Sequence, residues 1–376
     1  MKKNILSSFL FFICILFIFS SCNSTKELPQ NEYLIEGTIN NLSQDMKLVV
    51  SDISTKDIVP LYEVAIKQNG KFKLKEVITE PTPFYLTLIR ESDSTFSPSD
   101  NLVVFFEPSK MEIQANAGRL SEAKITGSRS HSHFEMYRKG IIGYEKSIKE
   151  LTAKAMNSSQ TEDTLAYQTA MAEYEKQYEE WKNYNKKFIA EDSIDYIVRS
   201  FLAVNYMLEE DYLTELETLV QGKTSTWTNQ IKSFVNQVKK ISVGQSAPTI
   251  STLQNAEGDS VSITGLEKKP TVLYFWASFE PQSASQVQQF GLLDTAKMNK
   301  EYQFVGISLD SDMDSWKETI KDLPQTHVQL IDNSNNQNAA ITYHLISLPL
   351  FVVLDENQKM IYKASSIEKL NAFLVK

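Results

Sequence analysis

Cysteine is almost missing from this chain of 376 residues, which contains only Cys14 and Cys22. No thiol lies beyond residue 22, so the body of the chain cannot form an internal disulfide. Disulfide exchange is also excluded there, because it requires a thiolate that attacks sulfur. A cysteine-free body must be stabilised by hydrophobic cores, and an apolar content of 42% suffices for about two or three of them.

Several motifs of catalysis are absent as well. The sequence has no glycine-rich phosphate loop, no Ser-His-Asp order and no metalloprotease helix motif. His131, Ser132, His133 and Glu135 include the residue types of a metal site, but alternate histidines where a loop meets a helix are usually solvated. His327 and His344 are expected to be structural. We therefore predict no metal site and no cofactor.

Positive charge is in deficit, since the formal net charge is −9 at pH 7. Removal of residues 1–21 would take away Lys2 and Lys3 and no acidic residue, which makes the remainder more acidic still. Binding to nucleic acid depends on positive charge that neutralises phosphates. Nucleic acid is therefore not an expected partner.

The N-terminus has the order of a secretory signal. Two lysines precede an apolar run over residues 5–19, and the small residues Ser20 and Ser21 follow it. The run is shorter than the roughly 20 residues that span a bilayer. We predict a signal peptide over residues 1–21.

The Ser20-Ser21-Cys22 sequence resembles the lipobox of bacterial lipoproteins, in which the cysteine thiol receives a diacylglycerol. The resemblance implies that Cys22 is the lipid attachment residue, that acyl chains such as palmitate anchor it, and that residues 22–32 form a tether. The outer membrane is the expected location, because Asn23 is not the Asp associated with inner-membrane retention. A secreted or uncleaved product is the alternative, since Phe19 replaces the usual Leu.

Residues 33–128 alternate apolar and polar positions, which predicts a small antiparallel β-rich domain. Strands are expected at 33–39, 48–51, 64–66, 72–74, 84–89, 102–106 and 111–115. Asn69-Gly70 is a strong hairpin signal, and Pro81, Pro83 and Pro108 are expected in the gaps. The 33–39 opening, the Asn-Gly-Lys-Phe turn and the 125–128 exit resemble the β-rich domain of unknown function found in Bacteroidetes-type lipoproteins. That family offers no settled activity.

Residues 129–242 are expected to be helical, because glycine and proline become rare. Aromatic and apolar side chains recur at spacings of three, four and seven between Tyr167 and Phe188, namely Tyr167, Met171, Tyr174, Tyr178, Trp181 and Phe188. This stripe could dock a partner, but we favour packing against neighbouring helices at 194–208, 212–220 and 227–238.

Residues 243–376 alternate strands and helices, which predicts an α/β sandwich. Strands are expected at 271–277, 304–310, 327–331, 350–355 and 360–364. Helices are expected near 281–298, 312–322, 335–343 and 367–375. The chain is thus predicted to be a multidomain α+β protein.

Three motifs in this last region occur in the order and spacing of the ResA/TlpA-type thioredoxin-like oxidoreductases. They are Gly244-Gln245-Ser246-Ala247-Pro248, Tyr274-Phe275-Trp276-Ala277-Ser278 and Ser347-Leu348-Pro349. The resemblance implies that Glu280 and Ser283 stand where that family carries its two active-site cysteines. It also implies that Pro349 is a cis proline facing them, with Trp276, Phe279 and Leu348 completing the cradle.

Neither replacement residue can exchange disulfides, because a carboxylate and a hydroxyl offer no thiolate. Tyr274 stands where thioredoxins carry a buried carboxylate that accepts protons. A helix N-terminus still favours a fixed anion such as Glu280, and Pro281 suits the first turn. A new role for Glu280 as a general base is disfavoured, since it lacks a paired nucleophile or metal.

We therefore interpret the chain as a lipid-anchored cell-envelope protein with a redox-inactive thioredoxin-like domain that binds a partner, such as an extended peptide or an envelope protein. An oxidoreductase of envelope redox homeostasis and a structural component of an envelope assembly are the two alternatives. An oxidoreductase would need a thiol, and the only one left after processing would be at the anchor.

Overall fold

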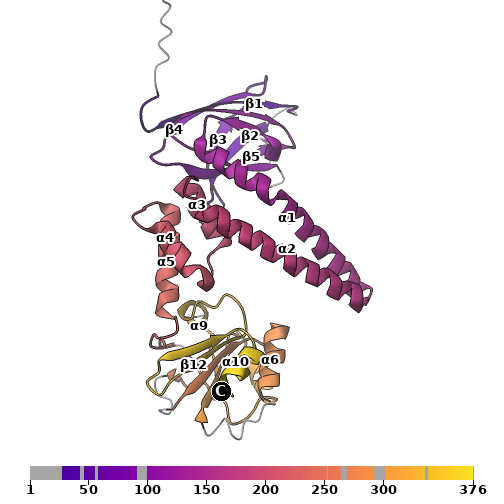
Figure 1. Ribbon diagram of the computed structural model, residues 1–376, viewed down its shortest axis with the longest axis vertical. Coiled ribbons are helices and arrows are strands. Elements are labelled where there is room, and N and C mark those ends of the chain that lie inside the picture. The colour runs from indigo at the N-terminus through magenta and orange to yellow at the C-terminus, as the bar shows by residue number, and fades with distance from the viewer. Residues whose placement is uncertain are drawn as a thin grey trace, which may run out of the picture. The chain divides into compact units, whose positions relative to one another are not determined.

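The computed structural model describes residues 28–42, 46–55, 58–90, 100–251, 253–263, 269–291, 301–334 and 338–375. The chain divides into two compact units, one ending at Phe134 and the other beginning at Glu135 (Figure 1). The predicted anchor Cys22 lies outside the described residues. The predicted bounds of the domains at 33–128, 129–242 and 243–376 stay predictions. Within the described part of the chain, no helix is long and apolar enough to cross a membrane.

The first unit contains two four-stranded sheets, with the strand orders β4-β1-β7-β8 and β3-β2-β5-β6. The strand bounds are β1 Glu32–Asn40, β2 Met46–Asp52, β3 Val59–Ala65, β4 Lys71–Val77, β5 Thr82–Arg90, β6 Asn101–Phe106, β7 Lys110–Asn116 and β8 Lys124–Thr126. A short 3-10 helix, η1, covers Leu120–Glu122. The predicted β-rich domain is therefore present.

Alternation along the strands builds the core of this unit. Tyr33, Ile35 and Ile39 of β1 are buried in one apolar cluster, while the side chains between them face outward. Gly37 shares the buried side, and a Cβ atom there would lie 2.1 Å from the ring of Phe72, its partner on β4. Glycine is thus required by the close approach of an aromatic ring.

The pairing of the strands differs from the prediction in three respects. β1 pairs with β7 in parallel, so the domain is not purely antiparallel. Gly70 has the positive φ of 76° expected of an Asn-Gly turn, but β3 and β4 belong to different sheets. Pro83 lies inside β5, paired with Phe105, instead of in a gap. Period-two patterning identifies strands, but it does not identify their partners.

Helices follow the first sheets and open the second unit. Their bounds are α1 Arg129–Gln160, α2 Thr164–Ala190, α3 Tyr196–Tyr206, η2 Glu210–Tyr212, α4 Leu213–Val220 and α5 Thr226–Lys240. Side-chain oxygens of Asp163, Asp195 and Ser225 accept backbone N–H groups at the starts of α2, α3 and α5. These caps satisfy helix donors that would otherwise lack partners.

The aromatic stripe of α2 packs mainly within the helical region. Trp181 lies 5.4 Å from Tyr206 of α3, and Phe188 lies 5.3 Å from Tyr137 of α1, measured between ring centroids. Tyr167, near the start of α2, is instead exposed. Packing against neighbouring helices is therefore confirmed for the C-terminal part of the stripe and not for its first residue.

The remaining residues of the second unit form a five-stranded sheet with the order β11-β10-β9-β12-β13. Its strands are β9 Thr271–Trp276, β10 Gln303–Ser308, β11 Val328–Ile331, β12 Leu350–Leu354 and β13 Met360–Ala364, and its described helices are α6 Pro281–Gly291, α8 Met313–Ile320, α9 Asn338–Thr342 and α10 Ile367–Leu374. All six residues of β9 are buried. Apolar clusters cover both faces of the sheet, which confirms the α/β sandwich.

Candidate functional site

The loop between β9 and α6 and the segment before β12 form the predicted site. Trp276 is the last residue of β9, and Pro281 is the first residue of α6. Leu350 begins β12 and pairs with Phe275 on the neighbouring strand β9. The structure therefore brings the residues around Glu280 and those around Pro349 to the same edge of the sheet.

Glu280 caps helix α6. Its carboxylate Oε2 accepts the backbone N–H of Ser283 at 2.6 Å, and its carbonyl oxygen accepts the N–H of Ala284 at 3.0 Å. The hydroxyl of Ser283 is fully buried and accepts the N–H of Ala277 at 3.4 Å. Glu280 thus satisfies a backbone donor at the start of α6, and Ser283 satisfies the backbone donor that follows β9.

A second carboxylate, which the sequence analysis did not identify, fastens the same loop. Asp310 is buried beyond the end of β10, and its Oδ1 accepts both the backbone N–H of Ser278 at 3.1 Å and the hydroxyl of Ser278 at 2.7 Å. Its Oδ2 accepts the hydroxyl of Ser308 at 2.6 Å. The sequence feature that could have identified Asp310 is a polar Ser-x-Asp sequence at the carboxyl end of a buried parallel strand. Functional groups of α/β sheets lie at such strand ends.

Tyr274 lies in the interior of the sheet, beneath the site. Its hydroxyl lies 3.2 Å from His327 Nδ1 and accepts an N–H from the Gln329 amide at 2.5 Å. Gly306 is its direct partner on β10, and a Cβ atom there would lie 2.7 Å from the tyrosine ring. Burial raises the pKa of Tyr274 above its ordinary value, so the phenol is neutral and cannot replace a proton-accepting carboxylate.

His327 is buried beside this tyrosine. Its ring stacks on Phe304 with the centroids 4.7 Å apart, and burial lowers its pKa to about 4. The imidazole is therefore neutral at pH 7. A neutral ring inside an aromatic cluster is structural.

The other histidines do not form a metal site in the described residues. His131 is buried at the start of α1, with its ring 6.2 Å from that of Phe134. His344 has a positive φ of 47°, and its ring makes an edge-to-face arrangement with that of Phe234, with the centroids 5.2 Å apart. The described part of the chain contains no group of three or more His, Cys, Asp or Glu residues arranged to hold a metal ion.

The segment before β12 presents open backbone and apolar side chains. The Leu348–Pro349 peptide bond is cis, as the resemblance implied. Among the described residues, the backbone groups of Ser347 and Leu348 have no hydrogen-bond partner. Ile346 on this segment is 70% exposed, and Phe279 on the facing loop is 68% exposed. Large exposed apolar side chains beside unpaired backbone are typical of a binding surface.

A cavity of about 330 Å³ adjoins this segment. Ser347 and His344 line one side, and Val238 and Ile241 at the end of α5 line another. Lys363 bridges the cavity to the helical region through an ion pair with Glu210 at 2.6 Å. The helical region therefore contributes directly to the surroundings of the predicted cradle.

Comparison with known families identifies two domains. Residues 33–134 match a domain of unknown function (DUF4369), and residues 267–360 match a family described as thioredoxin-like. The C-terminal region contains a thioredoxin-like domain. The first match ends at Phe134, which is also the last residue of the first compact unit. No curated protein matches the chain.

Several solved structures similar to the chain come from Bacteroides species. A thioredoxin-like protein from Bacteroides caccae is 16% identical, with 55% of this chain and 82% of that chain covered and a TM-score of 0.44. A thiol-disulfide oxidoreductase from Bacteroides fragilis is 29% identical, with coverages of 35% and 98% and a TM-score of 0.31. The thioredoxin domain of a thiol-disulfide oxidoreductase from Bacteroides vulgatus is 19% identical, with coverages of 35% and 98% and a TM-score of 0.31.

Proposed function

We propose that this chain is a lipid-anchored protein of the cell envelope whose thioredoxin-like domain binds an extended segment of a partner protein and does not exchange disulfides. The observation that carries the proposal is the backbone of Ser347 and Leu348, which has no hydrogen-bond partner in the described part of the chain and directly precedes the Pro349 that leads into β12. An extended peptide can add to such an open edge through main-chain hydrogen bonds.

Two exposed apolar side chains support binding at this edge. Phe279 and Ile346 lie on the two loops that meet at the site, and the adjoining cavity of about 330 Å³ offers room for a side chain of the bound segment. Main-chain pairing gives affinity in this mode, while pockets for side chains give specificity.

The absence of redox activity is argued from the residues themselves. Residues 243–376 contain no cysteine, the Glu280 carboxylate is engaged as a helix cap, and the Ser283 hydroxyl accepts the N–H of Ala277. The purified domain is therefore expected not to reduce insulin with a dithiol donor. Measurable turnover above buffer would overturn this part of the proposal and favour the oxidoreductase alternative.

The alignment with active enzymes has its own test. The double change Glu280→Cys and Ser283→Cys should recreate a closable dithiol, provided that the two Cα atoms lie roughly 4.4–6.8 Å apart. Counting of free thiols by mass spectrometry after mild oxidation measures the outcome. Two persistently free thiols in a folded protein would contradict the alignment.

Binding of a partner is tested by photo-crosslinking in intact envelopes. A photoreactive phenylalanine at position 279 or 346 should give a shared crosslinked band, while the same residue at Val375, which is also exposed, should not. The band should weaken when the other position is changed to serine. If neither position crosslinks, or if position 375 gives the same band, the binding proposal is wrong.

The lipid anchor is tested separately by metabolic labelling with a radioactive fatty acid. The wild type should be labelled and Cys22→Ser should not, because no other cysteine would remain in the processed chain. Fractionation of the labelled protein should recover it with the outer membrane. Equal labelling of both proteins would refute the anchor.

A further inference from the structure

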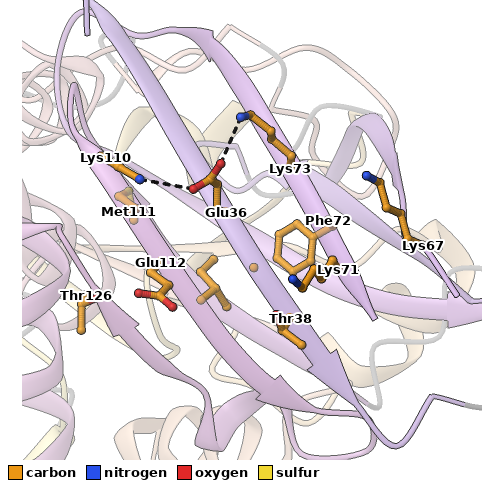
Figure 2. Close-up of a pocket in the computed structure, with 12 residues that line it drawn as sticks. Glu36, Thr38, Lys67, Lys71, Phe72, Lys73, Lys110, Met111, Glu112 and Thr126 are labelled. Atoms are coloured by element: carbon orange, nitrogen blue, oxygen red, sulfur yellow. Dashed lines mark hydrogen bonds and ion pairs between the residues drawn. The ribbon is translucent and has the colours of Figure 1, made fainter. Parts of the chain in front are cut away.

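The outward face of the sheet β4-β1-β7-β8 carries a hollow of about 540 Å³ (Figure 2). Residues of β1, β7 and β8 line it, including Thr38 and Thr126. Lysine side chains from β4, from β7 and from the turn before β4 stand around it in Figure 2. We call this the lysine face, and its charged members are Lys67, Lys71, Lys73, Lys110, Glu36 and Glu112.

The lysine face is positive in a chain that is acidic as a whole. Four lysines and two glutamates line it, whereas the formal net charge of the chain is −9. Glu36 is shared by Lys73 at 3.0 Å and Lys110 at 3.3 Å. Those two lysines hold the pKa of Glu36 below its ordinary value, so this carboxylate is ionised. Its charge is already paired with Lys73 and Lys110.

Two of the lysines remain without an acidic partner. Among the described residues, no ion pair involves Lys67 or Lys71, and both side chains are exposed. The turn at Gly70 holds them together, because the N–H of Lys67 donates to the carbonyl of Lys71 at 2.8 Å. The excess positive charge is therefore concentrated at one end of the face and is available to an external anion.

We propose that the lysine face docks on the anionic phospholipid headgroups of the membrane that holds the N-terminus. Charge complementarity favours this occupant, because several lysines on one surface attract the phosphates of anionic lipids. The choice of a membrane rests on the lipid anchor proposed above. Four lysines spread over β4, β7 and the turn before β4 can also contact several headgroups at once, which a single small ligand would not require.

The length of the chain before β1 permits this orientation. The ten positions from Cys22 to Glu32 can span at most about 33–36 Å. The nine residues of β1 extend over about 30 Å. A lipid at Cys22 could therefore reach the membrane while the whole face lies against it.

The test uses the chain from residue 23 onward, so that no lipid can contribute to binding. Cosedimentation is measured with vesicles of phosphatidylcholine mixed with phosphatidylglycerol, and with vesicles of phosphatidylcholine alone. The double variant Lys67→Gln/Lys71→Gln is compared with Lys139→Gln/Lys154→Gln, which removes the same charge from exposed positions of α1. Circular dichroism confirms that both variants are folded.

The wild type should bind the anionic vesicles and not the neutral ones. The Lys67/Lys71 variant should bind about thirtyfold more weakly, whereas the α1 variant should retain its binding. Binding should also vanish at about 1 M salt, where the screening length is about 3 Å.

Three results would overturn the assignment: no binding to anionic vesicles, equal binding of the two double variants, or binding that survives high salt. Saturable binding of inorganic phosphate to this face without any binding to vesicles would also overturn it. Because the assayed chain lacks Cys22, these failures are independent of whether the anchor proposal holds.

Discussion

Two sheets of this protein use their faces differently. In the sheet of the thioredoxin-like domain, β9 is buried along its whole length, and apolar clusters cover both faces. In the sheet β4-β1-β7-β8, buried and open residues alternate, and one face carries lysines and glutamates. A sheet that is covered on both faces can present functional groups only at the ends of its strands. A sheet that is covered on one face can bind a partner over the whole of its other face.

The largest expected effect concerns His327, inside the doubly covered sheet. The folded protein lowers the pKa of this histidine to about 4, while the unfolded chain binds the proton near 6.5. The contribution of this histidine to the free energy of unfolding should be fully present above about pH 6.5. It should fall by about 3 kcal/mol as the pH decreases from there through about 4, because the unfolded state binds more protons than the folded state in that window.

The measurement is urea unfolding of wild type and His327→Gln at about pH 7.5 and about pH 4.5. The glutamine variant should lose less stability than the wild type between the two values. An identical loss in both proteins would show that His327 is not the group that titrates.

The next effect tests the close packing between β9 and β10. In Gly306→Ala, the new methyl group would lie 2.3 Å from the Gln329 oxygen and 2.7 Å from the Tyr274 ring. We expect a loss of about 2 kcal/mol in the free energy of unfolding, since the buried ring cannot move away. Gly143→Ala is the control, because nothing lies within 4 Å in that helix, and it should raise stability by about 1 kcal/mol. A loss at both positions would refute the steric explanation.

The strand end should respond more weakly than the interior. Glu280→Ala removes the cap on the N–H of Ser283 and should cost about 1 kcal/mol of folding stability. Glu280→Asp should retain most of it, because aspartate is a favoured capping residue. Denaturant midpoints of the three proteins decide the matter, and equal midpoints for alanine and wild type would contradict a capping role.

The smallest effect belongs to the open face of the first unit. Lys73→Gln removes one of two lysines that contact Glu36, and Lys110 keeps its own contact with that carboxylate. Stability should change by less than about 0.5 kcal/mol, because exposed ion pairs contribute little. Thermal unfolding at low salt measures this change in stability. A loss of stability as large as that of Gly306→Ala would show that the two sheets do not differ in this respect.

The sequence predicted individual strands better than their partners. The strand Met360–Ala364 has the predicted bounds, and β9 ends within one residue of its prediction. The parallel pairing of β1 with β7 was not predictable from alternation, because the pattern is the same for either direction of pairing. Parts of the helices expected at 281–298 and 335–343 lie outside the described residues.

The sequence motifs predicted where the candidate site lies. They did not predict the contacts there between residues that are distant in the sequence. The helix start after Glu280 follows from Pro281 in the sequence, and the structure has α6 begin there. The clamp of Asp310 on Ser278 joins residues 32 positions apart, which no local pattern indicates. The pairing of Tyr274 with Gly306 likewise depends on the register of two strands.

The position of β1 between β4 and β7 sets an order for the assembly of the first unit during synthesis. The parallel partner of β1 begins at Lys110, so the first strand to emerge must wait for about 70 further residues before its second edge is covered. Until then its backbone is open to other chains. We expect cotranslational chaperones to be needed most in this interval, and a chain truncated before Lys110 should aggregate, whereas one ending after Phe134 should remain dispersed.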